Sequence, residues 1–256
     1  MITDPFVLGV AAAFGLMVGS FLNVCIVRLP ANESVVRPRS KCPKCGSPIA
    51  WYDNVPLLSW LVLLGRCRHC KTGISFQYPL VEAAVGGLWA AVVWYYGITA
   101  DAFTAGVFGT ILLGIAVTDA QTYLIPDEYT LGGLALGLLL SLRDGFHALG
   151  DAAVGAAVGF GLLYFVAWAG EKVFGEEAMG GGDIKMMAMV GTFVHWKGVL
   201  LTILGGALLG TLVFVPLSLK KKRLVPFGVF LAIGAGVVFV VGDTIARWYI
   251  EFLRAG

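Results

Sequence analysis

The sequence predicts an all-α membrane protein that crosses the bilayer about eight times. Its 256 residues are 58% hydrophobic and only 13% charged, and their mean hydropathy is +0.85. A soluble domain needs more polar surface than this to face water. Glycine is abundant, at 35 residues, which suits helices that pack closely in lipid. Together these observations exclude a soluble or secreted protein.

Apolar runs long enough to cross about 30 Å of hydrocarbon define the predicted helices. The eight candidates are 5–27, 79–97, 102–119, 129–142, 148–169, 184–196, 198–217 and 225–246. The fourth and sixth runs are short, so seven spans is the alternative. No basic segment precedes the first run, and we therefore expect a retained helix and not a signal peptide. The expected organisation is a first helix in 1–28, a polar segment in 29–78 and helices two to eight in 79–256.

The distribution of basic residues predicts the orientation of these helices. Lys and Arg gather in cytoplasmic loops of membrane proteins. If the N-terminus lies outside, the inner loops hold fourteen of the 18 basic residues, and the exceptions are Arg143, Lys197, Arg247 and Arg254. This orientation places the polar segment, Asp119 and Asp183 on the cytoplasmic side.

The polar segment holds two CxxC pairs. Cys42 and Cys45 form the first pair, Cys67 and Cys70 the second, with 21 residues between them. Four cysteines in this pattern can surround a structural zinc ion as a tetrahedron of thiolates. Two disulfides or four free thiols are the alternatives, and a reducing cytosol disfavours disulfides. Because four cysteines leave no open position for a substrate, we expect the zinc to stabilise the fold.

Two aspartates are the candidate catalytic residues. Asp119 ends the third span, and Asp183 opens the sixth after three glycines. The twelve residues from Asp183 to His195 cover only about 18 Å, which places Asp183 within the bilayer. Two neighbouring carboxyl groups can share a proton, so that one activates a water and the other polarises a peptide carbonyl. The pair therefore predicts aspartyl proteolysis by Asp119 and Asp183.

Other acidic residues are candidates for the catalytic role or for structural roles. Considered without Asp183, Asp119 is more simply interpreted as an ordinary acidic residue at the membrane interface. Asp127 is a second candidate for the catalytic role, although its simplest interpretation is an N-cap for the fourth span. Glu82 can cap the second span or support the site. Asp243 is expected near the outer face, with Arg247 one helical turn away as its ion-pair partner.

An ordered set of motifs runs along nearly the whole chain. It comprises residues 19–24, 28–30, both CxxC pairs, 53–60, 78–82, 124–127 and the GxGD motif at 180–183. In this set the chain resembles the type IV prepilin peptidases, the bifunctional enzymes of type IV pili and type II secretion. The resemblance implies that Asp119 and Asp183 cleave the leader of prepilins or pseudopilins on the cytoplasmic side of the bacterial inner membrane. It also implies N-methylation of the new N-terminal residue.

The resemblance implies S-adenosyl-L-methionine as the methyl donor and prepilins, pseudopilins and membrane lipid as partners, with no nucleic acid. The chain has no strand-linked glycine fingerprint for a nucleotide, so no residue is assigned to the methyl donor. Glycine pairs such as Gly155 and Gly159 are interpreted as helix-packing faces. Two other functions stay open, namely a proton-coupled transporter with membrane-buried carboxylates and a zinc-stabilised scaffold without catalysis.

Overall fold

The computed structural model describes residues 4–175, 179–218 and 226–255, apart from the side chains of 174, 214–218, 243 and 245–255. Its regular elements there are all helices, joined in one region by two isolated β-bridges. The all-α prediction is therefore confirmed. The chain divides into two compact units, Met1–Thr110 and Ile111–Gly256, which are described in turn.

The apolar helices are those of a membrane protein that crosses the bilayer several times. Among the described residues, four helices are long and apolar enough to cross it, namely Pro5–Ala31, Ala100–Thr122, Phe146–Val173 and Gly181–Val213. The helix Phe227–Gly242 is apolar but shorter. The total of about eight crossings stays a prediction. The proposed ion pair of Asp243 with Arg247 concerns side chains outside the described part of the chain.

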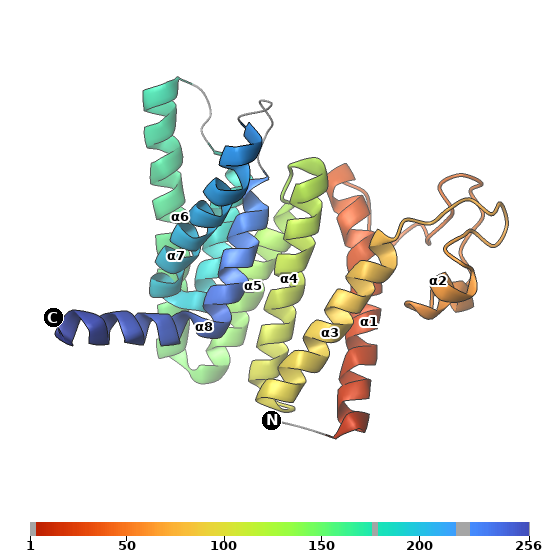
Figure 1. Ribbon diagram of the computed structural model, residues 1–256, viewed down its shortest axis with the longest axis horizontal. Coiled ribbons are helices and arrows are strands. Elements are labelled where there is room, and N and C mark those ends of the chain that lie inside the picture. The colour runs from red at the N-terminus through yellow and green to blue at the C-terminus, as the bar shows by residue number, and fades with distance from the viewer. Residues whose placement is uncertain (1–3, 176–178, 219–225, 256) are drawn as a thin grey trace. The chain divides into compact units, whose positions relative to one another are not determined.

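The first unit contains α1 (Pro5–Arg28), α3 (Gln77–Tyr96) and the first half of α4 (Ala100–Thr122) (Figure 1). Between α1 and α3 lie two short 3-10 helices, η1 (Leu29–Ala31) and η2 (Trp51–Asn54), and the five-residue helix α2 (Leu58–Val62). Helices α1 and α3 pack backbone to backbone. A Cβ on Gly15 would lie 2.7 Å from the carbonyl oxygen of Val85, so a larger residue there would push the helices apart.

The second unit is built around α7 (Gly181–Ser218). Helix α7 contacts α5 (Asp127–Ser141), α6 (Phe146–Phe174) and α8 (Phe227–Ala255). Gly155 and Gly159 of α6 lie directly against the α7 backbone, where a Cβ would collide with carbonyl groups of Gly191 and Met187. The prediction that these glycines form a helix-packing face is confirmed.

Helix α7 bends at His195. This residue has a φ of 55°, which is outside the helical range, and the chain continues helically on both sides of it. The bend falls at the end of the predicted span 184–196, just before the predicted span 198–217. One helical element, α7, therefore covers both predicted spans, and a bend replaces the expected loop between them.

Candidate functional site

Asp119 lies in the last two turns of α4 and is buried, with 5% of its surface exposed. Its Oδ2 accepts a hydrogen bond of 3.2 Å from the backbone N–H of Val229, in the first turn of α8. A Cβ on Gly228 would lie 2.9 Å from the same oxygen. The start of α8 therefore points a backbone donor at Asp119, and the glycine leaves room for the carboxyl group.

Asp183 lies in the first turn of α7 and is half-buried. Its Oδ1 is fully buried and has no hydrogen-bond partner among the described residues. Its carboxyl group is close enough to that of Asp119 for a direct Coulombic interaction. A buried oxygen without a partner is costly, and one beside a second carboxyl group is typical of a reactive site.

The loop between α4 and α5 lies against the start of α7 and the start of α8. Ile125 lies against both of them, since a Cβ on Gly182 would be 3.0 Å from Ile125 Cβ and one on Gly228 would be 2.7 Å from Ile125 Cδ1. Tyr123 turns the chain into this loop with a φ of 56°. Residues 124–127 were predicted as a motif, but the role of Ile125 was not predicted. The sequence signal for this role was an apolar loop residue, Ile125, together with a glycine at the start of α7 and another at the start of α8.

Asp127 does not cap α5, so that prediction is wrong. Pro126 is the N-cap residue, because its extended backbone (φ −59°, ψ 144°) ends the loop, and α5 begins at Asp127 itself. The carboxylate of Asp127 instead forms an ion pair of 2.6 Å with Nζ of Lys185, two residues after Asp183. This half-exposed pair ties the start of α5 to the start of α7.

The four cysteines come together in the first unit. The sulfur atoms of Cys42, Cys45, Cys67 and Cys70 all lie within 4.8 Å of one another, and those of Cys42 and Cys70 are 3.8 Å apart. A tetrahedral ion with metal–sulfur bonds of about 2.3 Å needs sulfurs about 3.8 Å apart. All four thiols are free, so the disulfide alternative is not supported. The group can hold a metal ion.

Two matching hairpins present these cysteines. The N–H of Cys42 donates to the carbonyl of Ser47 (2.9 Å), and the N–H of Cys67 donates to that of Thr72 (2.8 Å). A β-bridge closes each hairpin, between Lys41 and Pro48 in the first and between Arg66 and Gly73 in the second. The second hairpin therefore repeats the first, 25 residues later in the sequence.

The thiols of this cluster differ in acidity. Hydrogen bonds from the Ser47 hydroxyl and then from its backbone lower the pKa of Cys45 to about 6. The Thr72 backbone lowers the pKa of Cys70, but burial and the other cysteines outweigh it and raise that pKa to about 11. Since a metal binds the thiolate, at least one ligand is ionised at neutral pH before metal binds.

Glu82 supports the cysteine segment. It is buried in α3, and its Oε2 accepts a hydrogen bond of 2.8 Å from the backbone N–H of Leu57. The N-cap position of α3 belongs to Phe76 and not to Glu82. The structure therefore gives Glu82 a contact with the segment that holds the cysteines, and its support of the aspartate site stays a prediction.

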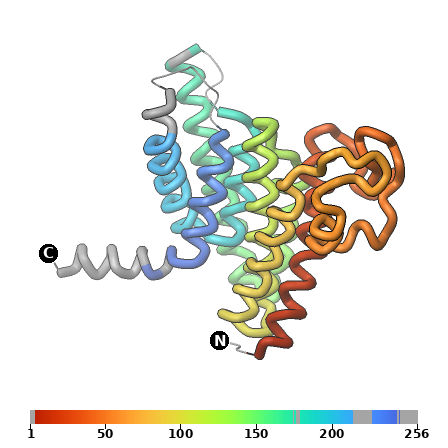
Figure 2. Tube along the Cα trace, turned by 45° about the vertical axis from the view of Figure 1, so that its right-hand side comes forward, coloured from red at the N-terminus to blue at the C-terminus, as the bar shows by residue number. Residues whose placement is uncertain are grey.

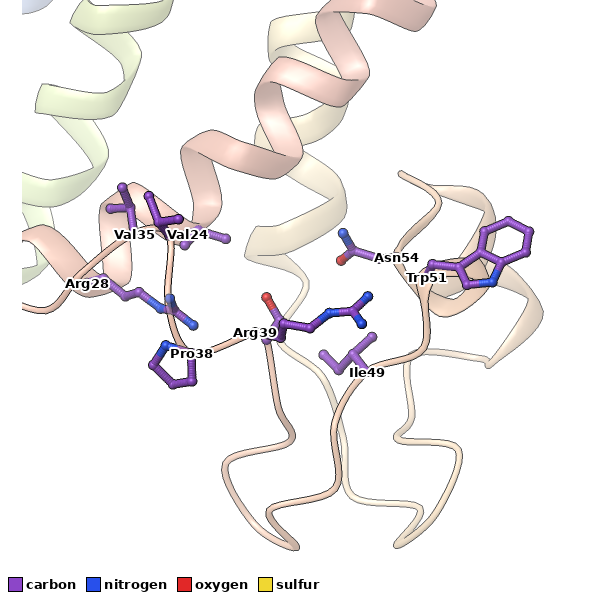
Figure 3. A pocket seen from close by; sticks show the side chains of 10 residues that line it. Val24, Arg28, Val35, Pro38, Arg39, Ile49, Trp51 and Asn54 are labelled. Carbon is purple, nitrogen blue, oxygen red and sulfur yellow. The ribbon is translucent and has the colours of Figure 1, made fainter.

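A cavity of about 280 Å³ lies between the end of α1 and the polar segment. Arg28, Arg39, Ser40 and Asn54 are among its lining residues. Figure 3 shows the Asn54 side chain directed into it and the Trp51 ring turned away from it. The other lining residues are apolar, so cationic, polar and apolar groups together line a small hollow beside the first helix.

Fold and sites define a helical membrane protein with paired carboxyl groups at helix ends and a four-cysteine cluster that can hold a metal ion. Residues 13–96 match the bacterial peptidase A24 N-terminal domain, and residues 106–215 match the type IV leader peptidase family. The chain belongs to the type IV leader peptidase family.

Three curated relatives carry the name prepilin leader peptidase/N-methyltransferase. The protein of Stutzerimonas stutzeri is 38% identical over 95% of this chain and 94% of its own length. That of Pseudomonas aeruginosa is 37% identical over 93% and 91%. That of Myxococcus xanthus is 42% identical over 83% of this chain but only 63% of its own length. No solved structure matches the chain.

Proposed function

We propose that this protein is an intramembrane aspartyl endopeptidase that removes the leader of type IV prepilins and pseudopilins and then N-methylates the new N-terminal residue. Family membership and the shared name of the relatives support both activities. The observation that carries the peptidase proposal is the placement of Asp119 and Asp183 at adjoining helix ends, with one buried oxygen that no described residue partners.

The surroundings suggest a role for each aspartate. The Val229 N–H at Asp119 suits a carboxylate, whereas the buried Oδ1 of Asp183 suits a protonated carboxyl group. Asp119 would then take a proton from the attacking water while Asp183 donates a hydrogen bond to the scissile carbonyl. When the tetrahedral intermediate breaks, Asp119 returns its proton to the departing amine.

The same proposal includes the orientation predicted from the basic residues. The protein would lie in the bacterial inner membrane with its N-terminus outside and both aspartates at the cytoplasmic side. A prepilin joins a basic leader to an apolar helix, so its scissile bond would lie at the membrane surface near the aspartates. The division into a helix at 1–28, a metal-binding segment at 29–78 and protease helices at 79–256 belongs to this proposal.

Two small groups complete the proposed function. We assign zinc to the cluster of Cys42, Cys45, Cys67 and Cys70, because four thiolates at tetrahedral spacing suit it. With four protein ligands the ion is structural. S-adenosylmethionine would supply the methyl group, and no residue is assigned to it.

The test is incubation of the protein with a synthetic prepilin, with and without S-adenosylmethionine, followed by mass spectrometry of the new N-terminus. We expect cleavage in both cases and a mass gain of one methyl group only with the donor. Asp119→Ala and Asp183→Ala should abolish cleavage in protein that still folds and inserts. Normal processing by either variant would overturn the assignment.

A further inference from the structure

The polar segment contains one run of ten uncharged residues, at 55–64. Leu57, Trp60 and Leu63 are half-buried, but other apolar side chains of the run are exposed. Leu61 is 59% exposed, Val62 75% and Leu64 81%. With neighbouring exposed residues they form what we call the apolar ridge, which comprises Trp51, Leu58, Leu61, Val62, Leu64 and Phe76. Several exposed apolar side chains gathered in one short segment favour an interaction site.

The ridge is held in this outward arrangement by buried polar contacts. The Ser59 hydroxyl accepts the N–H of Val55 and donates to the carbonyl of Tyr52, both at 3.0 Å. These bonds fasten α2 to η2 beneath the ridge. The contact of Glu82 with Leu57 fastens the start of α2 to α3.

Backbone strain at both ends of α2 also indicates that the surrounding structure holds the ridge in its exposed arrangement. Leu57 has a φ of 60° and Leu64 a φ of 50°, values that are unfavourable for a leucine. Such conformations persist only where the surrounding structure imposes them, and they cluster at functional sites. The exposed ridge is thus a built feature of the segment.

The charge of the segment that carries the ridge favours an anionic partner. Residues 29–76 contain two acids, Glu33 and Asp53, and seven basic residues, Arg37, Arg39, Lys41, Lys44, Arg66, Arg68 and Lys71. Asp53 is already paired with Arg68 at 2.6 Å. An excess of basic residues around apolar and aromatic side chains is the pattern that binds anionic lipid.

The location of the segment favours the membrane as that partner. Helix α1 precedes the segment and α3 follows it, so both of its ends are attached to apolar helices. Figures 1 and 2 show α2 and the cysteine hairpins beside α1 and not beyond its end. The Trp51 ring turns outward, away from the cavity (Figure 3), and tryptophan is enriched at the membrane interface.

We propose that the apolar ridge inserts into the headgroup region of an anionic leaflet and holds the four-cysteine segment against the membrane. Apolar side chains of α1, such as Phe21 and Val27, are also exposed. This inference rests on the helical membrane fold and not on the proposed peptidase activity.

Tryptophan quenching in nanodiscs tests the proposal. The full chain is placed in phosphatidylcholine and phosphatidylglycerol, with and without bromine on the lipid chains. The emission of Trp51 is obtained as the difference between the native protein and Trp51→Phe. We expect bromolipid to quench this emission and aqueous iodide to leave it nearly unchanged. Quenching by iodide alone would overturn the proposal, as would quenching only by a brominated prepilin peptide.

A matched pair of variants links the quenching to the ridge. Val62 and Val36 are 75% and 77% exposed in the same segment, but only Val62 belongs to the ridge. Val62→Asp should remove most of the bromolipid quenching of Trp51, whereas Val36→Asp should retain it. The metal content of both variants should stay at the native value, which shows that the segment is folded. Equal quenching in a metal-loaded Val62→Asp protein would contradict the proposal.

Discussion

The cysteine segment and the aspartate site are assembled in opposite ways. Two hairpins with the same backbone hydrogen bonds bring the cysteines together, and each hairpin is local in sequence. The aspartate site needs the end of α4 and the starts of α7 and α8, which are distant in sequence and meet around Ile125. The first site is made by local turns and the second by the tertiary fold.

The two sites also differ in whether their polar atoms have the partners that they need. Four thiols at tetrahedral spacing give a metal a complete set of ligands and no open position. The aspartate site leaves a buried oxygen of Asp183 without a hydrogen-bond partner in the described part of the chain. This difference suggests that the metal supports the fold and the aspartates carry the chemistry.

Loss of the metal should have the largest effect on stability. Structural zinc contributes about 10–16 kcal/mol to the folding of zinc-finger peptides. We expect Cys42→Ser with Cys67→Ser to remove the ion and abolish hydrogen-exchange protection in 41–49 and 66–74. Protection of the second unit should stay unchanged. Full thermal stability in metal-free protein would show that the metal is not structural.

Neutralising either aspartate should have the next largest effect. Asp119→Asn and Asp183→Asn should each lower the rate of leader cleavage by about 10²- to 10⁴-fold, because general acid–base catalysis needs both groups. Metal content and melting temperature should stay close to native values. Asp127→Asn is the matched control, and its rate of leader cleavage should fall far less. An equal loss in Asp127→Asn would move the catalytic role to that residue.

Filling the space beside Asp119 tests how the site is held. An alanine at position 228 would press its methyl group on Ile125 Cδ1 and Asp119 Oδ2, whereas at Gly236 of the same helix the nearest atom is 3.9 Å away. Overpacking typically costs about 1–3 kcal/mol. Gly228→Ala should therefore lower the free energy of unfolding and slow cleavage, and Gly236→Ala should do neither. Matching results for the two variants would contradict the close packing.

The ion pair at the edge of the site should matter less. Lys185 and Asp127 are 38% and 53% exposed, and pairs of this kind contribute about 1 kcal/mol or less. Lys185→Met should slow cleavage by no more than about fivefold, and added salt should reduce the native rate toward that of the variant. A loss as large as that of Asp183→Asn would give Lys185 a direct role.

The smallest effect is expected at Asp53 in the cysteine segment. Its hydrogen bonds with Arg68 hold the pKa of Asp53 below the ordinary value of 3.8. The stabilisation is therefore present above pH 3.8 and is lost as the pH falls through the lowered pKa. Asp53→Asn should melt slightly below the native protein at pH 7, and the difference should disappear in acid. A difference that grows in acid would contradict this assignment.

The sequence was most informative where structure is local. The CxxC spacing predicted the cysteine cluster because each hairpin forms within a few residues. Hydropathy predicted the helices because lipid requires long apolar runs. The bend at His195 was not visible, since neither glycine nor proline marks it.

Contacts between distant elements were harder to predict. Asp127 was expected to cap its own helix, but Pro126 takes that position and Lys185 of α7 takes the carboxylate. The role of Ile125 depends on two glycines, one 57 residues and the other 103 residues later in the sequence. Hydropathy and local motifs carry no information on such pairings. The catalytic roles of Asp119 and Asp183 stay predictions.

The most direct test compares cleavage of one synthetic prepilin by two proteins under the same conditions. One is the native chain after its metal has been removed, and the other is metal-loaded Asp183→Asn. If the cysteines support the fold and the aspartates carry the chemistry, the metal-free protein still cleaves the leader, and the variant is slower than the native protein by about 10²- to 10⁴-fold. Cleavage by Asp183→Asn at the native rate, or complete loss of cleavage in metal-free protein whose second unit stays folded, would contradict that account.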